Sequence, residues 1–309
     1  MLDLRPLRHF INIVDLGSLS RAAEFAGIAQ PALSHQVAAL EAELGVRLLH
    51  RTPQGTTPTE AGRTLYRYAR ALLRQLDETR RAVRDADGVL SGQVSIGLSV
   101  TTAEILCVPL LAALRQAHPA IRPEITALPN RLVRELLVNG RLDIALLFDQ
   151  PTVKGITAER LAAEEQYFIV APAAARAAAM APVPFAELGR HDLILPCRPH
   201  GIRVALETIL LREGIGYTVA VEIDSPPSLL EAVGSGLGAS VMPWAALHRH
   251  AASGRLSVHP FEGGLSREVM LCSSDASAPS DAADACRRLI QDVIRDLVAG
   301  GAWRGLRLL

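Results

Sequence analysis

The sequence predicts an α/β protein in three parts: an N-terminal winged helix-turn-helix over residues 1–60, a long linker helix over 61–90 and a two-lobed α/β domain over 91–309. Three observations favour this class. Short helices with small residues come first, a long helical stripe of apolar residues follows, and short apolar strands then alternate with helical patterns. We expect lobe I at about 91–163 and 268–309, and lobe II at about 164–267.

The first part contains residues that typically start and end helices, and their spacing predicts three short helices. Gly17 and Ser18 break the first helical pattern, and Ser18 can cap a second helix. Gly27 stands where a helix needs a left-handed terminator, and Pro31 suits the first turn of a third helix. Two helices joined by a tight glycine turn form the sequence signature of a helix-turn-helix, whose second helix enters the DNA major groove.

A polar, turn-rich segment at His50–Gly62 predicts a wing-like loop before a helix capped by Thr59. Apolar residues then recur in steps of four and three, close to a heptad seam, at Ala61, Leu65, Tyr68, Leu72, Leu76, Thr79 and Val83. Nothing nearby in sequence would cover this stripe, so we predict that the helix pairs with a second copy of the chain. Packing on its own domain is the alternative.

The last part contains seven short apolar strands with helical patterns between several of them. The strands are expected at residues 94–100, 143–148, 167–172, 192–196, 219–224, 238–243 and 268–274. Such alternation predicts a largely parallel sheet with helices on both faces, divided into two lobes. Ligands of such sheets bind at the carboxyl ends of strands, often in the crevice between lobes.

Composition restricts the compartment and the kind of partner. The formal net charge is zero, so an attraction to nucleic acid or membrane must be local. Asp3, Arg5 and Arg8 interrupt the first apolar run, which argues against a signal peptide, and no window reaches the roughly 18 uncharged apolar residues of a membrane span. The cysteines, which lack a C-x-x-C pair, favour a reducing cytoplasm without disulfides or zinc; they are Cys107, Cys197, Cys272 and Cys286.

The predicted recognition helix begins with polar side chains that could read bases or bind phosphate: Gln30, Ser34, His35 and Gln36. Helix capping with a solvated face is the alternative interpretation of the same residues. Positive charge favours the first interpretation, because the segment from Leu44 to Arg74 carries six arginines and a single acid, Glu60. That gives a local charge of about +5, as phosphate binding requires.

The segment "FINIVDLGSLSRAAEFAGIAQPALSHQVAALEAELGVRLLHRTPQGTTPTEAG" resembles the N-terminal domain of the LysR-type transcriptional regulators. "GRLDIALL" and "VGSGLGASVMP" look like later signatures of the same family, and "LILPCRPHGIR" resembles its subgroup with nitrogen-assimilation regulators. The resemblance covers the whole chain. It implies a two-lobed effector domain like that of periplasmic binding proteins.

The resemblance implies groove contacts by Gln30, Pro31, Ser34 and Gln36, and phosphate contacts by Arg51, Thr57 and Thr59. His35 stands where the family often has arginine, and a neutral imidazole reaches less far. The resemblance also implies double-stranded DNA, a small-molecule effector and RNA polymerase as partners. It further implies a homodimer through the linker helix, a homotetramer, a cytoplasmic location, and no membrane, metal or cofactor.

The segment Ser99–Glu104 follows the first strand and opens a helix, where hydroxyl and backbone N–H groups make an anion site. An ordinary helix cap is the alternative. Because the family places its effector there, between the lobes, the resemblance implies an anionic effector bound by Ser99, Thr101 and Thr102. Facing residues would be Phe148, His200 and Arg203, with Arg203 either pairing with a carboxylate or lying as a surface charge.

Two other function classes explain the sequence less well. An enzyme is disfavoured because no G-x-S-x-G elbow, P-loop, dinucleotide fingerprint or metal-spaced His/Cys set is present, and a solute-binding protein should carry an export signal. A purely structural dimer leaves the basic, hydroxyl-rich N-terminal part unexplained. Redox sensing by Cys107 and Cys197 is also disfavoured, since nothing beside them in sequence would lower a thiol pKa.

Overall fold

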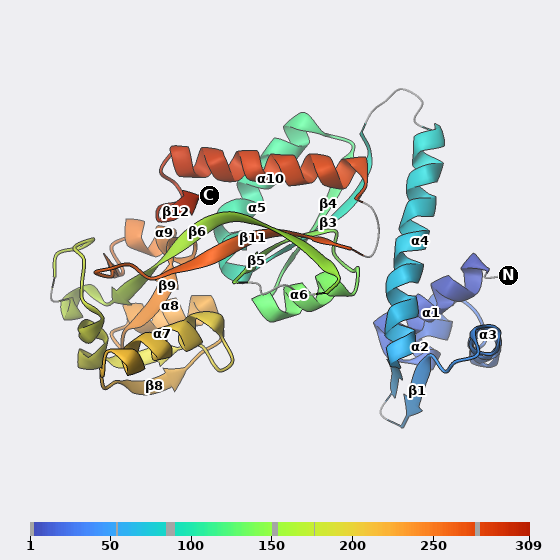
Figure 1. Cartoon of the computed structure of the whole chain (residues 1–309), viewed down its shortest axis with the longest axis horizontal. Coiled ribbons are helices and arrows are strands. Elements are labelled where there is room, and N and C mark those ends of the chain that lie inside the picture. The colour runs from blue at the N-terminus through green and yellow to red at the C-terminus, as the bar shows by residue number, and fades with distance from the viewer. Residues whose placement is uncertain (1–2, 54, 85–89, 150–153, 176, 276–278) are drawn as a thin grey trace.

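The computed structural model describes residues 3–53, 55–84, 90–149, 154–175, 177–275 and 279–309. Its N-terminal part is a helical unit with a two-stranded wing, followed by one long helix whose first half packs on that unit (Figure 1). The elements are α1 (Leu4–Leu16), α2 (Leu19–Ala26), α3 (Gln30–Leu44), β1 (Leu49–Thr52), β2 (Gly55–Pro58) and α4 (Glu60–Arg84). The winged helix-turn-helix is therefore confirmed.

The predicted helix ends follow local chemistry. The Ser18 side chain accepts a hydrogen bond from the backbone N–H of Arg21 at the start of α2. Gly27 ends that helix with φ +66°, a left-handed conformation that few residues other than glycine adopt without strain. Pro31 lies in the first turn of α3, where a missing N–H costs no helical hydrogen bond.

Lobe I has helices on both faces of its sheet. Strand β3 (Gly92–Leu98) pairs in parallel with β4 (Ile121–Ala127) and β5 (Ile144–Phe148), and α5 (Val100–Ala117) and α10 (Asp281–Ala299) share a core on one face. Helix α6 (Asn130–Val138) packs on the other face. Helix α5 is the one described helix long and apolar enough to span a membrane, but its buried face lies in this core.

The expectation of a largely parallel sheet is wrong, because the sheet is mixed. Strands β6 (Ile156–Val170) and β11 (Ser266–Ser274) lie antiparallel to each other, β11 also pairs antiparallel with β5, and β12 (Leu306–Leu308) pairs antiparallel with β6. The physical reason is that the chain leaves lobe I along β6 and returns along β11, so the two connecting strands run in opposite directions. Figure 1 shows them side by side between the lobes.

Lobe II is built on the second half of β6. Strands β9 (Ser240–Pro243) and β10 (Ser257–Pro260) pair with it, and a separate parallel pair is formed by β7 (Asp192–Leu195) and β8 (Thr218–Glu222). Its helices are η1 (Pro172–Ala174), η2 (Phe185–Arg190), α7 (Gly201–Arg212), α8 (Pro226–Gly234) and α9 (Trp244–Ala252). The backbone N–H of Gln166 donates to the carbonyl of Leu265 at 2.7 Å, so the outgoing and returning chains meet where the lobes join.

Several elements depart from the predicted strands. Three strands were not predicted, namely β4, β10 and β12, and β6 begins well before the expected residue 167. Val100, expected at the end of the first strand, opens helix α5 instead. The end of the linker helix, expected at residue 90, cannot be compared, because residues 85–89 lie outside the described residues.

The linker helix α4 has two different faces. Tyr66 and Ala69 are buried against the winged helix-turn-helix. Tyr68 and Leu72, in the predicted seam, are 56% and 54% exposed. The side chains of Arg74, Arg81, Arg84 and Val83 lie outside the described part of the helix. The alternative of packing on the own domain thus applies to the first part of the seam, where Ala61 and Leu65 pack against the N-terminal core, while Tyr68 and Leu72 point outward.

One carboxylate joins the N-terminal part to lobe I. Asp15 at the end of α1 accepts a hydrogen bond from the Tyr66 hydroxyl and forms ion pairs with Arg70 at 3.2 Å and Arg141 at 3.6 Å. Burial is the main cause that raises the pKa of Tyr66 to about 12, so the phenol stays a donor at neutral pH. Asp15 therefore connects α1, the linker helix and lobe I.

Candidate nucleic-acid interface and ligand site

Helix α3 presents a polar face to solvent. Gln30, Pro31 and His35 are exposed, and Ser34 and Gln36 are half-buried. The opposite face holds the buried core residues Leu33, Val37 and Leu40. The N-cap is Ala29, which has no side-chain capping bond. The polar side chains of the first turns are therefore not used as helix caps, although a solvated face, the other half of that alternative, is what the structure shows.

The wing lies beside this face. The Arg51 Nη1 donates to the Ser34 hydroxyl at 2.9 Å, which links β1 to α3. Thr57 on β2 is exposed and pairs with His50 across the hairpin. Base-reading candidates on α3 and phosphate-binding candidates on the wing thus share one continuous surface, as a winged helix requires.

Two predicted DNA contacts are already engaged inside the domain. The Thr59 hydroxyl donates to the Arg47 carbonyl at 2.7 Å and accepts from the Gly62 N–H at 3.0 Å, so it acts as the cap of α4. The Gln36 carboxamide oxygen contacts His9 Nδ1 on α1. Both side chains fix neighbouring elements. Gln30 and Ser34 are hydrogen-bonded as well, Gln30 Oε1 by the Ser20 hydroxyl at 3.3 Å and the Ser34 hydroxyl by Arg51, so such bonds alone do not rank the candidates for DNA.

The positive charge of this part is also partly neutralised. Arg63 forms an ion pair with Glu60, and Arg70 with Asp15, an acid that lies outside the Leu44–Arg74 segment. The sequence count of about +5 therefore overstates the charge that could face DNA.

The ligand-site candidates of lobe I gather at the start of α5. The Ser99 hydroxyl accepts from the Thr102 N–H at 3.1 Å and lies 3.1 Å from the Thr101 hydroxyl and 2.8 Å from that of Thr102. Ser99 and Thr102 are buried, and Thr101 is half-buried. The capping interpretation is thus right for Ser99, while the Thr101 hydroxyl is the one most open to a ligand.

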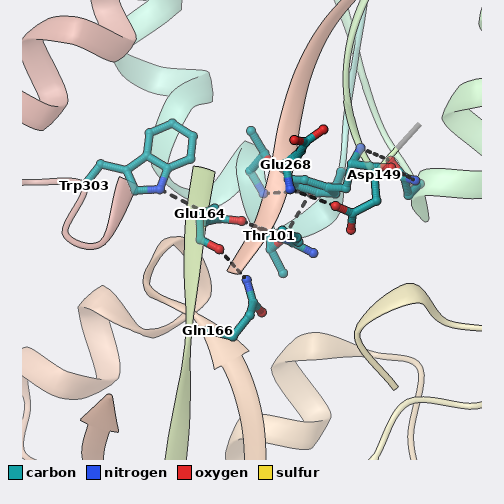
Figure 2. A network of polar contacts seen from close by, with 11 residues as sticks. Thr101, Asp149, Glu164, Gln166, Glu268 and Trp303 are labelled. Atoms are coloured by element: carbon teal, nitrogen blue, oxygen red, sulfur yellow. Dashed lines mark hydrogen bonds and ion pairs between the residues drawn. The ribbon is translucent and has the colours of Figure 1, made fainter. Parts of the chain in front are cut away.

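A polar network surrounds this helix start where the lobes join, with Thr101 lying between Glu164 and Asp149 in the view of Figure 2. The Arg267 guanidinium stacks on the Phe148 ring, with Cζ 3.3 Å from the ring centroid, and binds the fully buried Glu164 at 2.6 and 2.8 Å. The Trp303 indole N–H donates to the other Glu164 oxygen at 3.2 Å. Phe148 therefore lies at the junction as predicted, and the Arg267 guanidinium covers its ring.

The end of β5 is fixed to the return strand. Asp149 has φ +45°, a left-handed conformation, and its carboxylate accepts from the Glu268 N–H at 2.7 Å. Asn130 at the start of α6 accepts from the Phe148 N–H at 3.1 Å. Desolvation is the main cause that raises the pKa of the Asp149 carboxyl above its ordinary value.

Arg203 does not lie where the sequence suggested. Its guanidinium is buried in lobe II and binds Glu222 at 2.6 Å, Glu207 at 2.9 Å and the Pro196 carbonyl at 2.9 Å. Neither expectation for Arg203, an effector contact or a surface charge, describes this arrangement. Glu222, the acceptor on β8, could not be foreseen from the sequence. It reaches Arg203 on α7 only because β8 pairs with β7 in the folded lobe.

His200 is exposed and directly precedes α7. The surrounding protein removes part of its hydration, and the positive charge of Arg267 acts in the same direction; together they lower the pKa of His200 below its ordinary value. The imidazole is thus within electrostatic reach of Arg267 and is neutral at pH 7. Arg203, by contrast, is held inside lobe II by Glu207 and Glu222 and lies outside the junction.

Sequence reasoning missed most residues of the junction: Asn130, Asp149, Glu164, Gln166, Arg267, Glu268 and Trp303. The sequence did contain a signal for part of this site, because Glu164 and Gln166 alternate within the apolar run that becomes β6. A charged residue inside a buried strand needs a partner of opposite charge. The partner was not identifiable, because Arg267 is 103 residues away.

Comparison with known proteins identifies both parts of the chain. Residues 4–63 match the bacterial regulatory helix-turn-helix protein family, lysR type, and residues 87–295 match the LysR substrate binding domain. The chain belongs to the LysR family. It is therefore a DNA-binding transcriptional regulator with an effector-binding domain.

Relatives of this LysR-type chain include the nitrogen assimilation regulatory protein nac of Klebsiella aerogenes, 37% identical over 243 residues, or 78% of each protein. A full-length OxyR variant from Pseudomonas aeruginosa has the same fold, with TM-score 0.74, 24% identity and coverage of 96% of this chain and 95% of that one. CbnR complexed with its target DNA superposes with TM-score 0.63 at 20% identity, covering 96% and 99%.

Three cysteines of this LysR-type regulator have a raised pKa, which disfavours them as redox sensors. Burial raises the pKa of Cys272 to about 12 and of Cys286 to about 11. Burial and the charge of Asp224 also raise the pKa of Cys197. Because the thiolate is the reactive form, we expect Cys272 and Cys286 to resist iodoacetamide at about pH 8 in the folded protein, as mass spectrometry would show.

Peroxide treatment of the folded protein is expected to leave DNA binding unchanged. A loss of DNA affinity on oxidation that dithiothreitol reverses would contradict this prediction. Unfolded protein in urea serves as the control, since all four cysteines should then be alkylated.

Proposed function

We propose that this LysR-type regulator acts in the cytoplasm as a homodimer or homotetramer on paired DNA half-sites, and that a small anionic effector at the lobe junction changes the arrangement of its subunits. It would contact RNA polymerase, use no cofactor and catalyse no reaction. The effector has to bind one arrangement more tightly than the other to shift the population. The observation that carries the proposal is the uncapped, solvent-facing polar start of α3, to which Arg51 of the wing is hydrogen-bonded.

The dimer is supported by the linker helix. A groove of about 420 Å³ between α4 and the loop after α3 is lined almost entirely by apolar side chains: Leu44, Val46, Leu48, Ala61, Leu65 and Tyr68, with Thr64 and Glu60 at its edge. The seam continues from this groove to Leu72. Packing of a second α4 along the seam would cover these side chains. A twofold dimer then sets half-sites about one helical turn, ~34 Å, or a multiple of it apart.

An anionic effector is supported by the first turn of α5. The Thr101 hydroxyl is half-buried at a helix N-terminus, where backbone N–H groups and the helix dipole favour a negative charge. Phe148 and the neutral His200 would line the same site. The site holds no set of ligands for a metal, since no three His, Cys, Asp or Glu side chains converge suitably within the described residues.

The roles on α3 and the wing can be separated by two variants. Gln30→Ala should reduce discrimination between bases by about 1–3 kcal/mol, because it removes a base-edge contact. Arg51→Ala should weaken binding to every sequence and reduce the salt slope by about 1 per subunit, because it removes a phosphate contact. Footprinting of the purified protein on the DNA beside its own gene, at two salt concentrations, measures both effects.

Arg212→Ala is the matched control, since Arg212 is 72% exposed on lobe II and pairs with Glu213. It should leave footprint and salt slope unchanged. Equal, sequence-independent losses for Gln30→Ala and Arg51→Ala would contradict the assigned roles. Absence of any footprint or genome-wide binding would overturn the proposed function.

A further inference from the structure

The polar side chains at the start of α3 are oriented by the rest of the N-terminal domain. The Ser20 hydroxyl on α2 donates to the Gln30 carboxamide oxygen at 3.3 Å. One turn further along α3, Arg51 Nη1 on the wing donates to the Ser34 hydroxyl at 2.9 Å. Two different elements therefore engage the oxygen atoms of the two side chains that are expected to read bases.

Gln36 has the same arrangement in the second turn of α3. Its carboxamide oxygen contacts Nδ1 of His9 on α1, and the imidazole nitrogen is the donor, because a carboxamide oxygen can only accept. Helices α1 and α2 share one hydrophobic core with α3, which fixes where His9 and Ser20 stand relative to the two glutamines.

The groups that remain for an incoming ligand are donors. A carboxamide whose oxygen is engaged presents its two N–H bonds, and a serine hydroxyl that accepts still presents its O–H. Within the part of the chain that the structure describes, the amide nitrogens of Gln30 and Gln36 make no hydrogen bond. Ala29 provides no side-chain cap, so backbone N–H groups of the first turn are available as donors too.

The base edges in the major groove differ in what they offer to such donors. Guanine presents the acceptors N7 and O6 and thymine presents O4, whereas adenine and cytosine present amino donors at N6 and N4. A glutamine reads adenine through two bonds that need its oxygen as well as its nitrogen. Turning the Gln30 oxygen toward a base would break the Ser20 bond, at a cost of about two- to tenfold in affinity.

We propose that the start of α3 is pre-oriented as a donor surface that selects keto bases, guanine or thymine, over amino bases, adenine or cytosine. Ser20 and His9 are the positioning residues, and they act through Gln30 and Gln36 rather than on the bases. This inference rests on the proposed function, since it requires α3 to enter the major groove, and it names the class of base edge that the helix reads.

The test uses the full-length protein on the operator that footprinting identifies. Selection from randomised operators, with the unaltered protein and with Gln30→Ala, locates the base pair whose preference depends on Gln30. The bases of that pair are then replaced one at a time. The analogues 6-thioguanine and 4-thiothymine carry a weakly accepting sulfur in place of the keto oxygen, whereas purine and 2-pyrimidinone lack the amino group of adenine and cytosine.

The thio analogue should weaken binding by the unaltered protein about three- to tenfold more than binding by Gln30→Ala, because only the former loses a hydrogen bond to the keto oxygen. The amino-free analogue should affect both proteins equally. Comparison with Gln30→Ala removes the effect that each analogue has on the DNA duplex itself.

Variants assign the selection to Ser20. Ser20→Ala releases the Gln30 oxygen and should reduce the preference for the keto base about two- to tenfold, whereas Ser20→Thr keeps the hydroxyl and should retain it. Ser253→Ala is the matched control, because Ser253 is exposed in lobe II and its hydroxyl donates to the His250 carbonyl. Affinity for random-sequence DNA, which depends on phosphate contacts, shows that each variant is folded.

His9→Phe keeps an aromatic ring and removes the donor, so it should act in the same way at the base pair that Gln36→Ala identifies. The inference is overturned if the amino-free analogue costs the unaltered protein more than the thio analogue, if no base pair depends on Gln30, or if Ser20→Ala or His9→Phe keeps the full preference. The footprint of the unaltered protein tests the proposed function separately, since it does not depend on which base edges are read.

Discussion

Replacing Glu164 with alanine is expected to lower the free energy of unfolding of the effector domain by about 3–5 kcal/mol. Glu164 is fully buried and Arg267 is only 10% exposed, so the variant leaves a desolvated guanidinium without its counter-charge. The Trp303 indole N–H loses its acceptor as well. Urea unfolding followed by tryptophan fluorescence measures the change, because both tryptophans, Trp244 and Trp303, lie in this domain.

The control is Glu159→Ala, which breaks the pair of the half-exposed Glu159 with Arg287. Solvent screens that pair, so its loss should cost about 0–1 kcal/mol. Combining Glu164→Leu with Arg267→Met should restore much of the stability lost in Glu164→Ala, since both charges are then gone. A loss of less than about 1 kcal/mol in Glu164→Ala would show that the buried pair is dispensable.

Replacing Leu72 with glutamate is expected to convert the proposed dimer into a monomer. Leu72 is 54% exposed in the middle of the α4 seam, so glutamate is tolerated in the monomer but would place two carboxylates in the interface of a dimer. Light scattering after gel filtration measures the mass. DNA affinity should fall about 100-fold or more, because one subunit can no longer hold its partner near the second half-site.

Leu211→Glu is the matched control, since Leu211 is 83% exposed on α7 of lobe II, away from the linker helix. That variant should remain a dimer with unchanged DNA affinity. A dimer in Leu72→Glu, eluting as the unaltered protein does, would place the subunit interface elsewhere.

Features set by neighbouring residues were predictable from the sequence. Ser18, Gly27 and Pro31 act within one helical turn of themselves, and the steps of three and four to Leu72 need only the helical period. The sequence therefore predicted the helix-turn-helix, and in α4 it predicted an apolar stripe whose members Tyr68 and Leu72 are exposed. The capping role of Thr59 followed in the same way, although it competes with the DNA contact that the resemblance implied.

Features set by distant residues were not predictable. The direction of β6 relative to β11 depends on how the chain crosses between lobes, and alternating strands and helices suggested only a parallel sheet. Arg203 is held by Glu222 from a strand that follows its own helix, and Glu164 is held by Arg267. Hydropathy within one segment contains no information on such pairs, so the effector side of the junction was the least predictable part.

The hydrogen bond between Gln166 and Leu265 has a consequence for how such a protein can diversify. Because the two ends of lobe II meet at this bond, the lobe is topologically an insertion into lobe I, and a neighbouring pair of chain ends is what tolerated domain insertions share. Lobe II of a relative could therefore be exchanged as a unit at these two points. The exchange would replace the residues that lobe II contributes to the ligand site and would leave α3, the wing and the α4 seam unchanged.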